Sequence, residues 1–438
     1  MSATVGKAAK PTMNVWSVAA LGVGAMVGAG IFALLGQATL IAHGAVWMAF
    51  VIGGIVAGFS GYSHARLSAR YPSAAGVDAF FNKGFPSRTV AGSLSLFYLM
   101  SLAAAAALVA KSFGTYGARL AFGDGATTFW INVFATAIVI VLVILNTIGS
   151  RAVGRAEIVL VGVKLATLGV LLVAGSTSFQ ASRLTSTPGV GWEAIIACVG
   201  LTYFAYSGYS VMTNAADAVA RPKTTIPLAI YGAIGFVALL YVAISLIVLG
   251  NVSEADLAKY ADTAVAQAAV PVLGNAGFVA VSIAAMLATA SAINAILFSS
   301  MDMAIALGKD RQLPSAFTAV IHGTLTKGVT FAVLGVLVVL NFLDLTSIAF
   351  IASAGFLITY LAVFVAHWRL AKETASPRAV IACGFILMAV VLVMFEISVY
   401  RSQPIALVLT VAAIVAAVLI ESVMTRSSAS HPLQGVRE

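Results

Sequence analysis

Three glycines near the middle of the first apolar run have the spacing of a backbone binding site. Gly24, Gly28 and Gly30 lie within residues 15–42, a run long enough to cross a bilayer. Glycine costs a helix roughly 1 kcal/mol relative to alanine, and it lets another backbone or a ligand approach closely. In hydrocarbon, freed backbone groups persist only where protein, water or a solute satisfies them. The run therefore predicts either an interrupted helix at a binding site or close packing of two helices through Gly28.

The sixth apolar run repeats this feature. Residues 203–210 read Tyr-Phe-Ala-Tyr-Ser-Gly-Tyr-Ser, and Thr213 and Asn214 follow. Polar residues at this depth usually face a cavity or a partner helix. Two interrupted helices, each at the head of five apolar runs, indicate an inverted repeat with a binding site at its interface.

The direction of the two runs indicates the ligand. The half-helix that begins near residues 28–31 would point free N–H groups and a positive dipole end at the membrane midplane, which suits a carboxylate. The first half of the sixth run would end in free carbonyls near residues 204–207, which suit an ammonium group. A zwitterion satisfies both, and an α-amino acid is the simplest one.

Two charged residues lie in or beside the apolar runs. Lys164 lies ten residues or so into the fifth run, about 15 Å deep at about 1.5 Å per residue. A lysine there costs roughly 2.5 to 3.5 kcal/mol, and burial disfavours its charged form. Lys164 could therefore exchange a proton as the site opens to either side, or it could be a snorkelling or statically paired lysine. Asp217 lies close to Arg221 and Lys223, which favours a structural or gate ion pair over substrate contact.

Composition identifies the class of protein. The 438 residues are 61% hydrophobic and 9% charged, with a mean hydropathy of +1.04, so we expect an integral membrane protein. Residues 1–13 lack the apolar core of a cleavable signal, so the first run is expected to stay as a span. Cys198 and Cys383 lack metal-ligand spacing and are interpreted as packing residues. No cofactor, no metal and no catalytic constellation is expected.

The apolar runs predict an all-α fold of about twelve spans. They are residues 15–42, 44–69, 90–118, 126–148, 154–176, 191–219, 227–250, 270–307, 328–345, 347–370, 379–399 and 404–425. One transporter domain, 14–425, is predicted between the tails 1–13 and 426–438. Its repeats would be 14–176 and 191–370, with extra helices in 379–425. The outer connection 251–271 is polar and acidic and should hold a short surface helix.

Charge placement predicts the orientation. Most of the 24 lysines and arginines fall on the side of both termini, so the positive-inside rule puts both termini in the cytoplasm of a cell inner or plasma membrane. The net charge of +9 is explained by this bias, and no nucleic-acid partner is expected.

Four segments resemble one transporter family. Residues 24–32 are similar to the first-span signature of the amino acid, polyamine and organocation transporters, and residues 204–209 and 215–227 resemble the sixth-span signature. Residues 306–314 resemble the end of the eighth span. The resemblance covers essentially the whole chain in span number and order. It implies a five-plus-five inverted repeat with broken spans 1 and 6, two additional spans, and secondary transport by alternating access.

The resemblance also implies the site residues. Backbone N–H groups of Gly28, Ala29 and Gly30 would hold a substrate carboxylate. The backbone carbonyls of Met26, Phe204 and Ser207 would receive the substrate amine, and Ala205 belongs to the same predicted substrate-binding set. Lys164 is similar in position to a fifth-span lysine whose amine replaces a sodium ion in sodium-independent members, which implies proton coupling or ion-free exchange.

Several functional alternatives stay open. The third run offers Tyr98 and Ser101 but no carboxylate at mid-depth, which favours neutral amino acids. A polyamine or other organic-amine carrier would use the carbonyls and not the Gly28–Gly30 amides. A channel or a structural membrane subunit would leave the two matched helix breaks unexplained.

Overall fold

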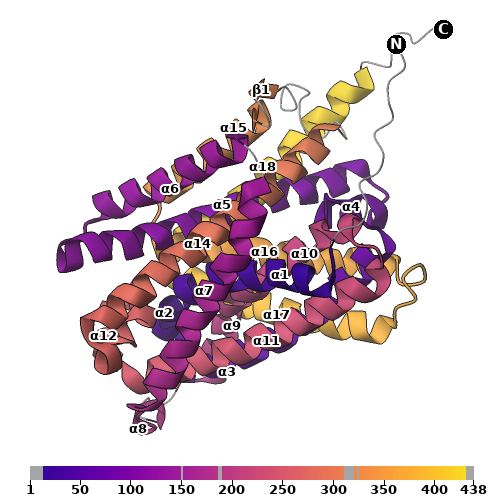
Figure 1. Cartoon of the computed structure of the whole chain (residues 1–438). Coiled ribbons are helices and arrows are strands. Elements are labelled where there is room, and N and C mark those ends of the chain that lie inside the picture. Colours follow the sequence, from indigo (N-terminus) through magenta and orange to yellow (C-terminus); the bar gives the residue numbers. More distant parts are fainter. Residues whose placement is uncertain (1–12, 149–150, 186–189, 310–319, 323–324, 431–438) are drawn as a thin grey trace.

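The computed structural model describes residues 13–148, 151–185, 190–309, 320–322 and 325–430, and most of them are helical (Figure 1). The α-helices are α1 Val15–Ala29, α2 Ile31–Ala42, α3 Val46–Arg70, α4 Val77–Gly84, α5 Arg88–Phe122, α6 Thr128–Ile148, α7 Arg151–Ser176, α8 Ser182–Thr185, α9 Trp192–Tyr206, α10 Val211–Asn214, α11 Pro222–Asn251, α12 Glu254–Lys259, α13 Ala264–Gln267, α14 Val270–Lys309, α15 Lys327–Phe342, α16 Leu345–Arg369, α17 Arg378–Ser402 and α18 Pro404–Ser430. The 3-10 helices are η1 His43–Ala45, η2 Gly123–Gly125, η3 Ser207–Ser210, η4 Ala216–Ala218 and η5 Ala261–Thr263. Two short strands, β1 Val320–His322 and β2 Leu325–Thr326, pair antiparallel.

The helices begin and bend where the local sequence directs it. The side chain of Asn14 accepts a hydrogen bond from Ser17 N at 2.9 Å and caps α1, and Pro222 occupies the first position of α11. Gly274 interrupts α14 with φ 60° and ψ −155°, a conformation that disfavours residues with a side chain. The outer connection holds α12, which confirms the expected surface helix.

Length and hydropathy show an integral membrane protein. In the described part of the chain, ten helical segments are long and apolar enough to cross a bilayer, and two shorter apolar helices lie at Val15–Gly28 and Ala332–Phe342. The segment Ile31–Arg70 joins the second half of the first predicted span to the second predicted span. The number of crossings and the repeat boundaries stay predictions. The predicted tails 1–13 and 426–438 lie largely outside the described residues.

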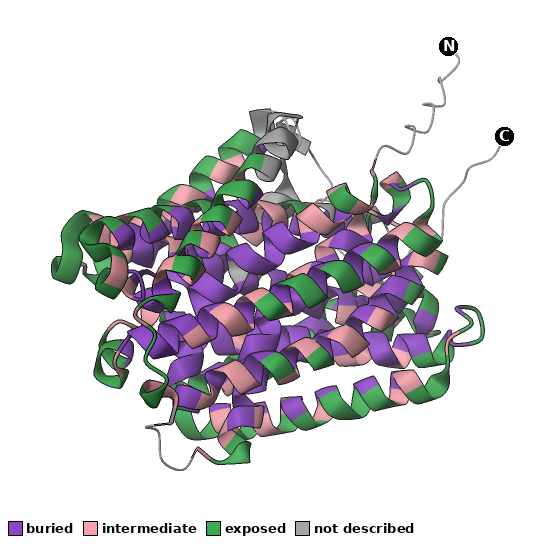
Figure 2. Cartoon of the chain, turned by 60° about the horizontal axis from the view of Figure 1, so that its bottom comes forward, coloured by how far each residue is buried: buried purple, intermediate pink, exposed green. Residues whose placement is uncertain are grey.

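The surface of the bundle is apolar. Buried residues fill its middle, and exposed residues follow the outward faces of the helices (Figure 2). Many of these exposed residues are large and aliphatic, among them Val173 on α7 and Val423 on α18. A soluble protein rarely exposes so much contiguous apolar surface, whereas lipid chains cover it at no cost.

The inner helices pack in pairs around α1 and α9. The helix α5 lies along α14, α3 along α11, and α1 against both α11 and α14. On α5, the buried residues Ala104 to Ala107 keep side chains small where neighbouring helices approach. This arrangement places the interrupted first and sixth runs in the centre of the bundle.

Candidate functional site

The first apolar run is interrupted at Gly30. Here α1 ends at Ala29, Gly30 has φ −91° and ψ −82°, and α2 begins at Ile31. Gly30 N–H still donates to Met26 O at 2.8 Å, so the break is one residue long. No side chain caps the start of α2. The first N–H groups of α2 therefore have the orientation that an anion requires at a helix N-terminus.

The sixth run changes its helical type instead of unwinding. The helix α9 ends at Tyr206, η3 continues through Ser207–Ser210, and α10 resumes at Val211. A 3-10 segment in mid-helix often marks a hinge. The backbone thus departs from α geometry in the predicted segment.

The two interruptions lie against each other. A Cβ at Gly208 would be 2.6 Å from Met26 N and 2.8 Å from Ala25 C, so η3 packs directly on the backbone of α1. A Cβ at Gly30 would be 2.7 Å from Ala205 Cβ. Glycine at both positions permits the approach of the two chains. Gly28 has a different neighbour: a Cβ there would be 2.2 Å from Ala288 O on α14. At Gly28, α1 and α14 therefore pack closely, which was the second of the two interpretations of the glycines in the first run.

Tyrosine hydroxyls donate to the carbonyls at these interruptions. Tyr241 on α11 donates to Met26 O at 2.5 Å and to Ala205 O at 3.1 Å, so one hydroxyl joins both runs. Tyr360 on α16 donates to Ser207 O at 3.2 Å. The carbonyls of Met26 and Ser207 were expected to receive a substrate amine. Met26 O already accepts two hydrogen bonds, from Gly30 N and from Tyr241 Oη, so an amine would have to displace one of these donors.

Phe204 O is also engaged. It accepts hydrogen bonds from the backbone N–H of Ser207 and from Ser207 Oγ at 2.7 Å. The sequence analysis missed Tyr241 and Tyr360, although a tyrosine inside an otherwise aliphatic span is itself a signal of a polar neighbour.

A small cavity lies beside η3. It measures about 30 Å³ and is bordered by α1, α5, α9, α10, α14 and α16, with Tyr98, Ser207 and Ser210 among its polar lining. Tyr98 Oη donates to Ser210 Oγ at 3.4 Å. The volume suits roughly two water molecules and is too small for an amino acid. Binding of a larger solute therefore requires the surrounding helices to separate.

Lys164 is fully buried in α7. Its Nζ donates to Gly24 O on α1 at 2.7 Å and to Ser291 Oγ on α14 at 3.3 Å. The amine thus joins three helices next to the first interruption. Its depth in the membrane and its role in coupling stay predictions.

Asp217 lies in η4 and is exposed. In the part of the chain that the structure describes, its carboxylate has no ion pair within 4.0 Å, so the expected pairing with Arg221 or Lys223 is not formed in this conformation. The backbone beside it is tied to the chain start, because Met13 N donates to Ala218 O at 3.2 Å. A gate role for Asp217 stays a prediction.

A polar cluster lies farther along α2, away from the central cavity. Gln37 Nε2 on α2 donates to Asp262 Oδ1 in η5 at 2.6 Å, and Thr346 Oγ1 on α16 donates to Gln37 Oε1 at 2.9 Å. A Cβ at Gly36 would be only 1.6 Å from Ala261 O, so η5 rests on the backbone of α2. Removal of Asp262 from water raises the pKa of its carboxyl.

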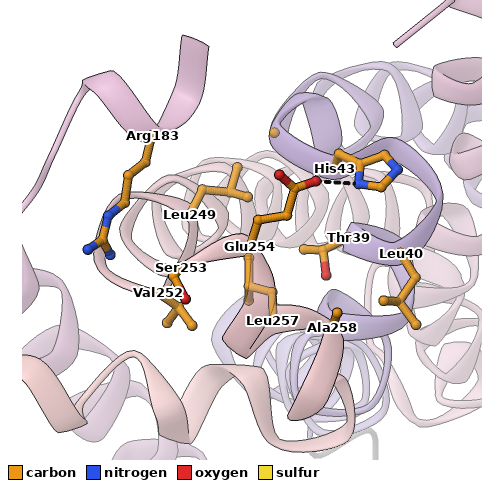
Figure 3. Close-up of a pocket in the computed structure, with 11 residues that line it drawn as sticks. Thr39, Leu40, His43, Arg183, Leu249, Val252, Ser253, Glu254, Leu257 and Ala258 are labelled. Carbon is orange, nitrogen blue, oxygen red and sulfur yellow. Dashed lines mark ion pairs between the residues drawn. The ribbon is translucent and has the colours of Figure 1, made fainter. Parts of the chain in front are cut away.

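A larger pocket of about 320 Å³ lies beyond this cluster, between the ends of α2 and α11, α8 and α12 (Figure 3). His43 Nδ1 and Glu254 Oε1 are 3.0 Å apart across its rim, and Arg183 lies on the other side. This pocket is separate from the central cavity, and none of its lining residues belongs to the predicted substrate site.

Known proteins resemble the whole chain. The family model described as "Amino acid permease" matches residues 13–429. The chain is 40% identical to the "Inner membrane transport protein YbaT" of Escherichia coli (strain K12), over 98% of this chain and 99% of that protein. It is 23% identical to the "Methylthioribose transporter" of Bacillus subtilis (strain 168), over 86% and 84% of the two chains. It is 22% identical to the "Cationic amino acid transporter 9, chloroplastic" of Arabidopsis thaliana, over 71% and 57%.

Proposed function

The chain belongs to the amino acid permease family, and from this premise we propose that it moves an amino acid across the membrane by alternating access. It is a multi-pass membrane transporter and not an enzyme. The finer proposal is a secondary active carrier of neutral α-amino acids, with both termini in the cytoplasm.

The meeting of two interrupted runs carries this proposal. The N–H groups that begin α2 suit a carboxylate, and the carbonyls of Ala205 and Ser207 suit an ammonium group a short distance away. Ser207 borders the central cavity, and η3 packs on the backbone of α1 a few residues before the break at Gly30, so a solute that carries both charges would gain from both ends.

The packing supports an inverted repeat. If α1–α2 correspond to α9–α10, then α3 corresponds to α11, and α5 to α14. Two contacts then have counterparts: α1 packs on α11 as α9 packs on α3, and, with α7 matched to α16, α14 packs on α7 as α5 packs on α16. A repeat with its binding site at the interface is the architecture that alternating access uses.

The lining of the cavity favours a neutral substrate. Among the described residues that border it, none is a carboxylate, and its polar side chains are hydroxyls and the amide of Asn214. A cationic side chain would lack a counter-charge there. Two relatives are named for different solutes, methylthioribose and cationic amino acids, so their names do not identify the substrate of this chain. We therefore base the substrate class on the residues that line the cavity.

Ligand stabilisation tests the substrate class. Amino acids and amines without a carboxylate are added to the detergent-solubilised protein, and its apparent melting temperature is recorded. A ligand at 100 times its Kd adds ~2.7 kcal/mol to the folded state. We expect stabilisation by neutral amino acids and none by their decarboxylated amines. Stabilisation by the amines alone would favour the organic-amine carrier, and counterflow in proteoliposomes separates any carrier from a channel.

Lys164 is proposed as the proton-coupling group. Lys164→Gln keeps a hydrogen-bond donor toward Gly24 O and removes the titratable amine, so uptake into proteoliposomes should lose its pH dependence. Lys111→Gln is the matched control, because Lys111 is also buried but bonds to Asn132 Oδ1 and to the carbonyls of Leu340 and Leu343, away from the cavity. An unchanged pH profile in Lys164→Gln would remove the coupling role.

A further inference from the structure

A groove on the outer surface of the bundle lies apart from the central site. It runs between the end of α16 and the start of α17, and we name it the α16–α17 groove. Its volume is about 310 Å³, and its walls are apolar side chains that include Phe364, Trp368, Phe385 and Ile386. Trp368, Phe385 and Ile386 are exposed, so the groove opens to the surroundings of the bundle.

Two arginines stand at the end of the groove that adjoins the α16–α17 connection. Arg369 lines the groove, holds its guanidinium 4.9 Å from the centre of the Phe85 ring, and donates from Nη1 to Gly84 O at 3.3 Å. The guanidinium carbon of Arg378 lies 5.2 Å from the centre of the Trp368 ring. The aromatic rings thus hold both cations at one end of an apolar channel.

The charge at this end is not neutralised within the described residues. There, neither guanidinium has a carboxylate within 4.0 Å. The one acid of the connection, Glu373, accepts a hydrogen bond from Tyr71 Oη instead. Lys372 in the same connection is exposed and adds a third positive charge.

We propose that the α16–α17 groove binds an acidic phospholipid. One acyl chain lies along the apolar walls, and the phosphate accepts hydrogen bonds from Arg369 and Arg378. A guanidinium offers up to five donors in a planar fork that matches a phosphate, and Arg369 spends one of them on Gly84 O. Basic pockets between membrane helices bind anionic headgroups in this way.

The shape of the groove favours a lipid over a protein partner. Both helices are long and apolar enough to cross the bilayer, so the groove faces acyl chains along its length. Its positive charge is confined to one end, where a headgroup would lie, and Trp368 is of the residue type found at the membrane interface. Membrane helices associate mainly through small residues that let their backbones approach closely, whereas the exposed walls of the groove carry the large side chains of Trp368, Phe385 and Ile386.

Lipid titration tests the proposal. The full chain in detergent micelles is titrated with dioleoylphosphatidylglycerol or dioleoylphosphatidylcholine, and native mass spectrometry counts the bound lipids. We expect phosphatidylglycerol to be preferred, and the double variant Arg369→Gln/Arg378→Gln to weaken its binding by ~10- to 30-fold, from about one kcal/mol for each arginine. Both arginines are exposed, so the variant should fold.

Two controls separate the groove from general charge and from headgroup binding. Arg401→Gln removes an exposed arginine from the opposite end of α17 and should leave the preference unchanged. Ala382→Phe fills the groove and should displace the lipid although both arginines remain. Inorganic phosphate at the concentration of the lipid should not displace it, because phosphate meets the two arginines but gains nothing from the apolar walls.

Three results would overturn the proposal. They are an undiminished preference for phosphatidylglycerol in the double variant, an equal loss in Arg401→Gln, or displacement by inorganic phosphate. A dimer that Ala382→Phe dissociates would assign the groove to a second copy of the chain.

Discussion

The contact between Gly30 and Tyr241 gives the sharpest test of how the two interrupted runs are held together. An alanine at position 30 would place its Cβ 2.3 Å from Tyr241 Oη, 2.7 Å from Ala205 Cβ and 2.8 Å from Met26 O. Ordinary contacts begin near 3.4 Å, so the neighbours would have to move by up to about 1 Å. Overpacking of a close-packed interior costs ~1–3 kcal/mol.

Tyr241 has little freedom to move aside. Its ring centre lies 5.4 Å from that of Phe50 and 5.2 Å from that of Tyr206, and its hydroxyl donates to two carbonyls. Gly30→Ala should therefore lower the free energy of unfolding by ~1–3 kcal/mol. Tyr241→Phe should cost a similar ~1–3 kcal/mol, because it deprives two buried carbonyls of a donor.

The double variant decides whether the contact is the cause. Removal of the hydroxyl relieves the shortest of the three contacts, so Gly30→Ala/Tyr241→Phe should cost less than the sum of the single variants, with a coupling of ~0.5–3 kcal/mol. The recovery should be partial, since Ala205 Cβ and Met26 O still lie within 2.8 Å.

The assay is denaturant titration in detergent micelles, paired with uptake into proteoliposomes. Gly58→Ala on α3 is the control, because a Cβ there meets nothing within 4 Å, so the change should not destabilise the chain and should add up to about 1 kcal/mol from helix propensity. This explanation of the Gly30–Tyr241 contact is refuted if Gly30→Ala lowers the free energy of unfolding no more than the control does. It is also refuted if the losses in the two single variants simply add in the double variant.

Two further predictions concern polar groups that do not border the central cavity. The raised pKa of Asp262 means that the folded chain favours the protonated carboxyl, so the stability of the folded chain should fall as pH rises from about 4 through that raised pKa. Asp262→Asn should flatten the pH dependence of the melting temperature in this range. An unaltered profile would contradict the assignment. Lys111→Gln should lower the free energy of unfolding by ~1–3 kcal/mol, because the carbonyls of Leu340 and Leu343 lose their charged donor. The substrate preference of this variant, measured by counterflow, should stay the same. A shift in that preference would show that Lys111 reaches the substrate site.

Local sequence anticipated the places where the backbone departs from α geometry. Glycine at position 30 and the hydroxyl-rich residues 203–210 weaken an α-helix by their own chemistry, and the structure interrupts or alters the helix in both segments. The membrane class and the surface helix α12 follow in the same way from hydropathy and polarity over short windows.

Partners distant in the chain could not be predicted from these patterns. Tyr241 Oη donates to both Met26 O and Ala205 O, and this double contact depends on how α11 packs against α1 and α9. The ion pair expected for Asp217 is not formed among the described residues of this conformation, because closeness in sequence alone does not bring the charges within 4.0 Å.

Two kinds of information are therefore separable in this protein. The sequence by itself determined that the chain lies in a membrane and where its spans weaken, because hydropathy and backbone propensity act over one or two helical turns. Only the tertiary structure decided that the carbonyls of Met26, Ala205 and Ser207 bond to tyrosines, that Lys164 reaches Gly24 O, and that the central cavity is small. These are contacts between helices far apart in the chain, and their geometry is set by packing, which no local pattern records.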